Sequence, residues 1–528
     1  MAELQPAGKD GTHILIGGGI ASLAAATILL RDAHIDGRQI RILEDSDTLG
    51  GSLDASGNAQ GGYLTRGGRM FEEHFACTFA LFDSVASIDD PDRSVSADIR
   101  DFNRKVVSRS HCRLVRNGRK SEDRYSLKLD GADRVALGRL MLAGETGLSG
   151  RTIESWFRKS FFNSNFWLFW STMFSFEPWH SLVEMRRYMR RFVHLFPGLP
   201  TLSGILRTRY NQYESLILPL QQWLCARRVS FTTGRAVTDV EIIGDTQKRL
   251  VTRICLDDGQ DILVGPADRV YLTLGSMTDA TTYGSNTVAP SHQDQPGPSW
   301  RLWKRLAQAQ PGLGRPEVFC GEPARTAWHS FTVTLDRPHF HQFMEQFSGN
   351  PSGTGGLVTF ADSTWLMSIV MAHQPHFRNQ PPDTSIFWGY GLRGDCRGDA
   401  VKKSMWEASG DDLLSELAWH LGLNAQQRRW FDGARVIPCR MPFITSQFMP
   451  RVAGDRPPVH PEGAGNFAIM GQFCELERDC VFTVEYSVRS AWEAVAAMTS
   501  NVSPPPPVVR TDRDPMVLLR ALHSLLFD

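Results

Sequence analysis

The chain has 528 residues, 57 basic and 57 acidic side chains, and 42% hydrophobic residues. That length exceeds one compact core, so about two to four domains are expected. A net charge of zero provides no basic field for nucleic acid, which we therefore exclude as a partner. Nine cysteines without a CxxC pair or zinc-like spacing predict no metal site and, with a polar start lacking a signal peptide, a cytoplasmic location. No apolar run reaches the ~18 residues of a membrane span.

The first predicted element is an apolar strand at 13–16, which runs into three glycines and then a helix-forming stretch. Gly17 permits the tight turn, and Gly19 lets the backbone approach a pyrophosphate at the helix N-terminus. Ser22 takes the third position of the pattern and is small enough for close packing. A second strand ends at Glu44, at the spacing where an acid accepts ribose hydroxyls. The residues expected to contact a dinucleotide are Gly17, Gly19, Ile20, Ala21, Ser22 and Glu44.

Two further glycine-rich segments follow. Gly50-Gly51-Ser52 fits either a turn beside a bound diphosphate or a plain surface turn. Arg66-Gly67-Gly68-Arg69 sets two glycines between two cations, a combination suited to a phosphate or a flavin edge. After it, phenylalanines recur every four residues at Phe71, Phe75 and Phe79, which predicts a helix that faces the core.

The middle of the chain changes character several times. Aromatic residues crowd 151–192, which predicts a helical subdomain whose rings pack together, line a long apolar tunnel, or do both. Alternating patterns over 229–274 predict a β-meander that returns to the nucleotide-binding sheet and ends at Gly275-Ser276. The stretch 285–315 is rich in Pro, Ser and Gln and indicates a linker or exposed loop. A mixed α/β block covers about 316–440.

The C-terminal part predicts a return to the first domain. A strand at 466–470 ends in glycine, Gln472-Phe473 follow, and a helix is expected over 484–498. After the prolines at 504–507, a short amphipathic helix at 516–527 is expected to cap the core, with peripheral membrane contact as the alternative.

Together these clusters resemble the fatty acid hydratases, the oleate hydratase or myosin-cross-reactive-antigen family. The resemblance runs from about His13 to Arg489, nearly the whole chain. The motifs that carry it are Arg66–Cys77, Asn165–Trp170, Trp179–Ser181, Tyr210–Leu220, Gly355–Phe360, Ala372–Phe377, Trp388–Leu392, Met441–Arg451 and Gly471–Arg489.

The resemblance implies an FAD-containing hydro-lyase. Such an enzyme adds water reversibly across the cis double bond of a free unsaturated long-chain fatty acid, of the oleate to 10-hydroxystearate type, with no net redox. The flavin shapes the site and acts electrostatically. The additional residues expected at the cofactor are Gly50, Gly51, Ser52, Arg66, Gly67, Gly68, Arg69, Gly275, Ser276, Gln472 and Phe473. As partners we expect the fatty acid and, for the chain itself, a monomer or homodimer.

The resemblance also assigns catalytic residues. The family's proton donor is a tyrosine at the position of Tyr188, and a phenol with an ordinary pKa of about 10 stays protonated at neutral pH. The family's water-activating glutamate follows the Arg-Gly-Gly-Arg motif, but here that position is Met70, and a thioether is no base. Glu72 or Glu73 could take over, or backbone and flavin groups alone could hold the water.

For the substrate carboxylate, the family pattern points to three neutral polar side chains. Gln212 and Thr445 match it, and Gln447 stands where other members carry a different polar residue. Two other function classes remain open from the sequence: a flavin oxidoreductase of amine oxidase or desaturase type, and a catalytically weak fatty-acid-binding homologue that lacks the glutamate.

The predicted fold class is α/β, a Rossmann-like FAD-binding domain with an inserted mixed α/β substrate domain and a helical subdomain. The expected segments are 11–85 for the first part of the FAD-binding domain, 86–227 for the aromatic-rich helical substrate subdomain, 228–290 for the returning β-meander, 291–440 for the mixed substrate domain, 441–500 for the last part of the FAD domain, and 501–528 for the C-terminal amphipathic helix.

Overall fold

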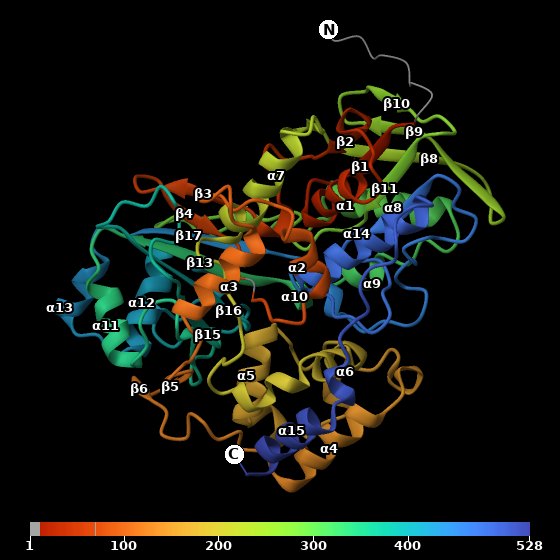
Figure 1. Ribbon diagram of the computed structural model, residues 1–528. Coiled ribbons are helices and arrows are strands. Elements are labelled where there is room, and N and C mark those ends of the chain that lie inside the picture. The colour runs from red at the N-terminus through yellow and green to blue at the C-terminus, as the bar shows by residue number, and fades with distance from the viewer. Residues whose placement is uncertain (1–10, 69, 528) are drawn as a thin grey trace.

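The computed structural model describes residues 11–68 and 70–527, and its fold begins with a five-stranded parallel sheet (Figure 1). β1 is central: all of its residues are buried, and it has a hydrogen-bonded strand on either side. Every pairing in this sheet is parallel. In hydrogen-bonded order the strands are β18 (Phe467–Met470), β11 (Arg269–Thr273), β1 (His13–Ile16), β2 (Ile40–Leu43) and β7 (Ser230–Thr232).

Two helices from opposite ends of the chain pack together beside this sheet. α1 (Ile20–Arg31) follows the glycine turn and is buried from Ile20 to Leu29. It contacts α14 (Val484–Met498), which follows β18, and α7 (Leu218–Cys225). The late strand–glycine–helix unit therefore rejoins the first one, which confirms the Rossmann-like arrangement predicted from the sequence.

The predicted β-meander is present as a separate antiparallel sheet. It consists of β8 (Val237–Asp245), β9 (Lys248–Leu256) and β10 (Asp261–Leu263), after which the chain enters β11. The prediction that 285–315 is only a linker or loop is wrong, because α8 (Pro298–Ala309) lies within it and packs against β8. Buried Trp300 and Trp303 give that helix an apolar face that the polar average composition concealed.

The second large sheet is mixed, and its strands come from segments far apart in the sequence. Its strand β13 is buried at every residue and pairs antiparallel with two neighbours. A two-stranded hairpin lies against β13, where the backbone N–H groups of Tyr63 and Thr65 donate to threonine hydroxyls. In order, the sheet contains β12 (Thr282–Tyr283), β17 (Arg435–Met441), β13 (Trp328–Leu335), β16 (Ser385–Gly391), β15 (Met367–Met371), β14 (Gly356–Phe360), β5 (Leu114–Arg116) and β6 (Arg119–Lys120). The hairpin is β3 (Ala55–Asn58) and β4 (Gly62–Thr65), and the flanking helices are α11 (His339–Ser348), α12 (Gly410–His420) and α13 (Ala425–Arg428).

A helical layer completes the fold and holds the aromatic side chains predicted for it. Trp170 is buried there, with its ring stacked on Phe166 and edge-on to Phe196. The helices of this part are α2 (Ala76–Phe82), α3 (Val95–Lys105), α4 (Gly131–Leu142), α5 (Asn165–Phe174) and α6 (Leu182–Arg191). The short helices α9 (Glu317–Cys320) and α10 (Pro323–Thr326) follow α8, and Phe319 of α9 packs on Trp303 of α8.

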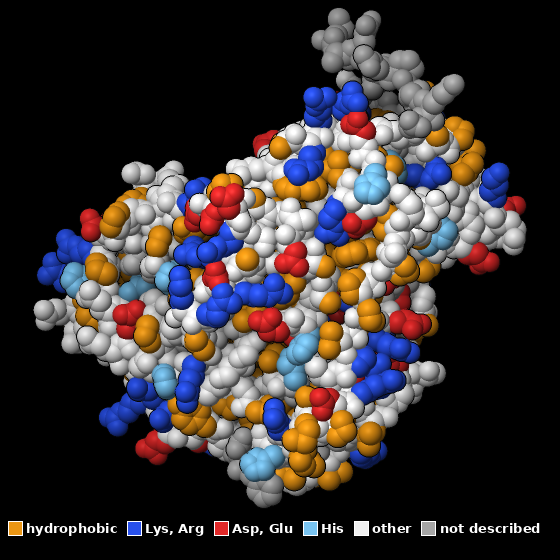
Figure 2. Space-filling model, viewed as in Figure 1, with side chains coloured by type: hydrophobic (Ala, Val, Ile, Leu, Met, Phe, Trp, Pro, Cys, Tyr) orange, Lys and Arg blue, Asp and Glu red, His pale blue; other side chains and the backbone are white. Residues whose placement is uncertain are grey.

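The C-terminal helix α15 (Pro515–Phe527) packs against the short helix η6 (Val193–Gly198), as the capping prediction requires. It still exposes Met516, Leu519 and Leu522, and Figure 2 shows hydrophobic side chains gathered at this end of the molecule. Within the described residues, no helix combines the length and apolar character needed to cross a bilayer.

One predicted helix is shorter than its pattern indicates. Phe71 lies outside α2, in an extended bridge whose backbone exchanges two hydrogen bonds with Leu206, and α2 begins only at Ala76. Phe75 and Phe79 are nevertheless buried. The side chains from Met70 to Phe75 therefore do not follow the periodicity of a helix.

Candidate active site between two cavities

The first cavity encloses about 480 Å³ at the carboxyl ends of the parallel strands. Most of the residues predicted to bind the dinucleotide line it, and they come from both ends of the chain. They are Gly17, Gly19, Ile20, Ala21, Glu44, Gly50, Gly51, Ser52, Arg66, Gly275, Ser276, Gln472 and Phe473.

The glycine turn presents bare backbone to this cavity. Gly17 has a φ of +96°, a conformation that L side chains rarely adopt. Gly19 caps α1, and a Cβ added there would meet no atom within 4 Å. The first turn of α1 has neither a side-chain cap nor an acidic residue. Its N–H groups are therefore open to an anion, as a pyrophosphate site requires.

Glu44 follows β2 and is buried at the edge of the same cavity. Its carboxylate accepts the Gly18 N–H and, through Oε1, the N–H and hydroxyl of Ser46 at 3.0 and 2.7 Å. Burial and then the neighbouring Asp45 raise the pKa of Glu44 to about 7. The group is therefore a hydrogen-bond acceptor whose charge changes near neutral pH.

Three described residues that were predicted to contact the cofactor do not line the first cavity. Ser22 is fully buried within α1, so the structure gives it a packing position. Gly67 and Gly68 line the second cavity. Arg69 lies outside the described residues.

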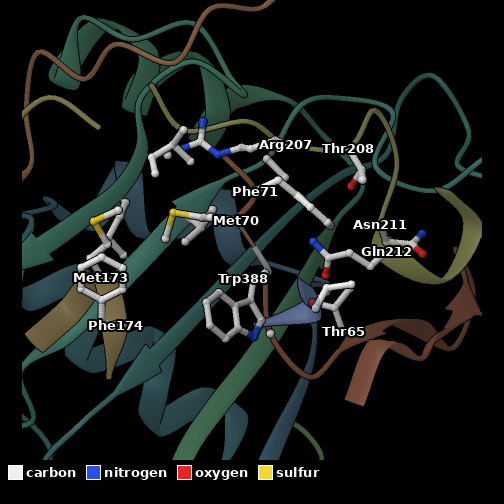
Figure 3. A pocket seen from close by; sticks show the side chains of 18 of the residues that line it. Thr65, Met70, Phe71, Met173, Phe174, Arg207, Thr208, Asn211, Gln212 and Trp388 are labelled. Atoms are coloured by element: carbon white, nitrogen blue, oxygen red, sulfur yellow. The ribbon is translucent and has the colours of Figure 1, made fainter. Parts of the chain in front are cut away.

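The second cavity is apolar and encloses about 170 Å³ among the helical layer, the mixed sheet and the segment after Arg66 (Figure 3). Aromatic rings form much of its wall, including Phe71, Phe174 and Trp388. Within the aromatic-rich segment, Phe174 therefore lines this cavity, whereas Phe166 is buried in side-chain packing.

A thin wall separates the two cavities. Arg66 lines the first cavity, whereas Gly67, Gly68 and Met70 line the second. The Arg66 guanidinium is fixed by Asp54, at 2.7 Å, and by the carbonyl of Gly51, at 2.6 Å, and Asp54 borders both cavities. A planar group at the end of the first cavity would therefore reach the wall of the second.

Tyr188 stands in the wall of the second cavity, on α6. Its ring is 1% exposed and packs edge-on against Phe174 and Phe176, each with centroids 5.0 Å away. Its hydroxyl donates to the carbonyl of Val481 at 2.6 Å. The phenol is thus held in one orientation inside an apolar chamber.

The three residues considered for water activation lie in different surroundings. Met70 lines the second cavity and projects into it in Figure 3. Glu73 is on the surface, its side chain 57% exposed and 3.9 Å from Arg100, so the structure does not bring it to the cavity.

Glu72 borders the cavity and lies among three basic side chains. Its Oε1 lies 2.7 Å from Arg191, and its Oε2 lies 2.8 Å from Nδ1 of His74 and 3.3 Å from Nε2 of His194. Burial alone would raise the pKa of Glu72, but the two histidines and Arg191 hold it well below its usual range. A carboxylate so stabilised is a weak proton acceptor.

Of the three residues predicted to hold the substrate carboxylate, Gln212 lines the second cavity. Thr445 is buried elsewhere, with its hydroxyl donating to the Thr326 carbonyl at 3.0 Å, and Gln447 is fully buried with its amide on the Ile444 carbonyl. Neither of these two is among the residues that line the second cavity. Sequence reasoning missed Arg207, which does line it; only its place in a polar cluster before Gln212 marks it in the sequence.

The parallel sheet, its glycine turn and the added mixed sheet define a Rossmann-like α/β protein. An oxidoreductase from Methanosarcina mazei has this fold, with a TM-score of 0.51 and 14% identity over 91% of this chain and 98% of that one. This likeness confirms the predicted fold class.

The sequence comparisons are more specific. Residues 11–496 match the model of the MCRA family, and the chain belongs to that family. It is 36% identical to the oleate hydratase of Streptococcus pyogenes serotype M49 (strain NZ131), over 99% of this chain and 91% of that one. It is 31% identical to the linoleate hydratase of Lactiplantibacillus plantarum, over 97% and 98%. The resemblance inferred from the motifs is confirmed.

Proposed function

We propose that the protein is an FAD-dependent hydratase that adds water across the cis double bond of a free unsaturated long-chain fatty acid. The similarity to an oleate hydratase and a linoleate hydratase supports the reaction class. The observation that carries the proposal is the buried Tyr188 phenol in an apolar cavity whose wall is shared with a dinucleotide cavity.

The residues of the first cavity fit FAD. The uncapped N-terminus of α1 and the open space at Gly19 suit the pyrophosphate, and Glu44 suits the adenosine ribose. Arg66 and Gly67 would meet the flavin end, next to the second cavity. When bound, the flavin would supply an electron-rich surface that stabilises positive charge developing on the substrate.

Tyr188 would act as the general acid. An unactivated alkene needs a proton donor, and the phenol can transfer its proton to one alkene carbon while the other carbon becomes electron-poor. The surrounding rings of Phe174 and Phe176 exclude bulk water, which protects the cationic carbon from uncontrolled side reactions.

Water then adds to the electron-poor carbon and loses a proton, which restores the phenol after transfer through water. The overall change is one alkene plus one water to one alcohol. Met70 cannot accept that proton, Glu73 is remote, and two histidines and Arg191 hold the pKa of Glu72 well below its usual range. We therefore propose that this enzyme orients water with polar and backbone groups and hydrates more slowly than a member with a glutamate at position 70.

The test is to incubate the purified protein with FAD, a reductant and oleate, and to analyse the lipid by mass spectrometry. A gain of one water supports hydration. A desaturated or oxidised product would favour a flavin oxidoreductase, and unchanged oleate would favour a binding homologue; either result refutes the proposal.

A further inference from the structure

The second cavity contains a cation that the proposed chemistry does not use. Arg207 lines the cavity beside Gln212, and Figure 3 shows its guanidinium group at the cavity edge. Its Nη1 donates to the Gly353 carbonyl at 2.9 Å and to the Ser108 hydroxyl at 3.2 Å. A Cβ added to Gly356 would lie 2.2 Å from its Nη2, so the glycine leaves room for this position.

Arg207 has no acidic partner within the part of the chain that the structure describes. None of the ion pairs there includes it, and no described group accepts a hydrogen bond from its Nη2 or Nε. Burial alone lowers the pKa of Arg207 to about 10, so the side chain still carries its charge at neutral pH. Arg207 is half-buried, and a cation in such a position without a charged partner is a favourable site for an anion.

A second unpaired cation increases that demand. Arg113 is fully buried, donates to the carbonyls of Leu199 and Phe169, and has no ion pair among the described residues. Burial lowers its pKa to about 9; Tyr390 opposes this shift, and the charge of Arg207 makes a smaller contribution in the same direction as burial. Two guanidinium groups that repel each other therefore lie close together, and one of them, Arg207, lines the cavity.

We propose that Arg207 is the binding site for the carboxylate of the fatty acid. This inference rests on the proposed function for the class of ligand. The guanidinium fork offers a carboxylate two parallel N–H donors, a strong and orienting contact, and Gln212 lies in the same wall. The site assigns the carboxylate to Arg207 rather than to Thr445 and Gln447, which lie outside this cavity.

The assignment sets the direction of the lipid chain. In Figure 3 Met70 lies between Arg207 and Phe174, and the Phe174 ring packs on Tyr188. With its carboxylate at Arg207, the acyl chain would extend past Met70 towards the phenol. Free acids would bind, whereas an alcohol of the same length would gain nothing from Arg207.

The experiment measures binding of oleate and of oleyl alcohol to the FAD-loaded full-length chain, for the wild type, Arg207→Gln and Arg209→Gln. Arg209 is the matched control because it is two residues away and paired with Asp98 at 2.9 Å. We expect Arg207→Gln to weaken oleate binding about 10- to 100-fold, the range of a charged hydrogen bond, and to leave oleyl alcohol unchanged. Arg209→Gln should alter neither. Because Arg207→Gln breaks no ion pair among the described residues, the melting temperature should change little.

Equal oleate affinity in the wild type and Arg207→Gln would overturn the inference, as would equal losses for acid and alcohol. These outcomes are separable from failure of the proposed function. If the wild type bound oleate through Arg207 without forming hydroxy acid, hydration would be refuted and the carboxylate site retained. If it hydrated oleate with a KM unaffected by Arg207→Gln, the reverse would hold.

Discussion

The two cavities are built on different principles. The first cavity presents glycine turns and the N-terminus of α1, and its ionisable groups include Glu44 and Asp279. The second cavity is made of side chains from many elements, with Tyr188, Met70 and Arg207 coming from a helix and two irregular segments. The first cavity should therefore tolerate substitution of most of its side chains, whereas in the second cavity a single residue can determine the chemistry.

The largest effect on activity is expected from a substitution in the second cavity. Tyr188→Phe removes the proposed proton donor and should lower kcat for hydration about 100- to 10,000-fold, the usual contribution of a general acid. Oleate affinity should stay within a few-fold, because the ring and its packing remain. Turnover is measured by the rate of hydroxy-acid formation, and a kcat close to that of the wild type would remove Tyr188 from this role.

The second largest effect is expected in the first cavity, from a substitution that adds a side chain where the structure has open space. Gly19→Val should weaken FAD binding about 100-fold, or about 2.8 kcal/mol, since the side chain would occupy the open space at the N-terminus of α1. Gly131→Val is the control, because Gly131 also opens a helix and also meets nothing within 4 Å, yet lies outside the first cavity. Flavin fluorescence titration measures both. Equal FAD affinity in the two variants would contradict the placement.

A gain of function sharpens the contrast further. Met70→Glu places a base in the second cavity and should raise kcat about 10-fold or more. Met70→Gln is a size-matched control that lacks a base. The gain should disappear at acid pH as the new carboxylate is protonated. If Met70→Glu and Met70→Gln have the same kcat at every pH, water activation does not depend on position 70.

The smallest effect concerns Glu44 in the first cavity. Because the pKa of Glu44 is raised to about 7 and ribose hydroxyls donate to its ionised form, FAD affinity should increase several-fold as the pH rises from 6 to 8. Glu44→Gln should flatten that dependence while leaving the contribution of Asp279, in the same cavity, in place. An equally steep pH dependence in Glu44→Gln would assign it to another group.

The same contrast explains what the sequence could predict. The strand–glycine–helix pattern at 13–31 and the acid at Glu44 are local, and each part matches the structure closely. The mixed sheet could not be assembled from patterns, because β5 pairs with β14 across more than 200 residues of sequence. Phe71 was wrongly placed in a helix because its pairing with Leu206 is non-local.

Arg207 is the clearest residue that the sequence concealed. In the sequence it belongs to a polar cluster, and Arg209, two positions later, has the same side chain. What distinguishes them is a partner: Asp98 pairs with Arg209, whereas no described acid pairs with Arg207. Whether an arginine has an acidic partner depends on the folded structure and is not visible in the sequence.

The most direct test is a crystal structure of the protein with FAD and oleate bound. The account predicts the flavin ring beside Gly67 and Gly68, the carboxylate on the Arg207 guanidinium, and the double bond within reach of the Tyr188 hydroxyl. A double bond far from Tyr188, or a ring remote from the second cavity, would contradict it.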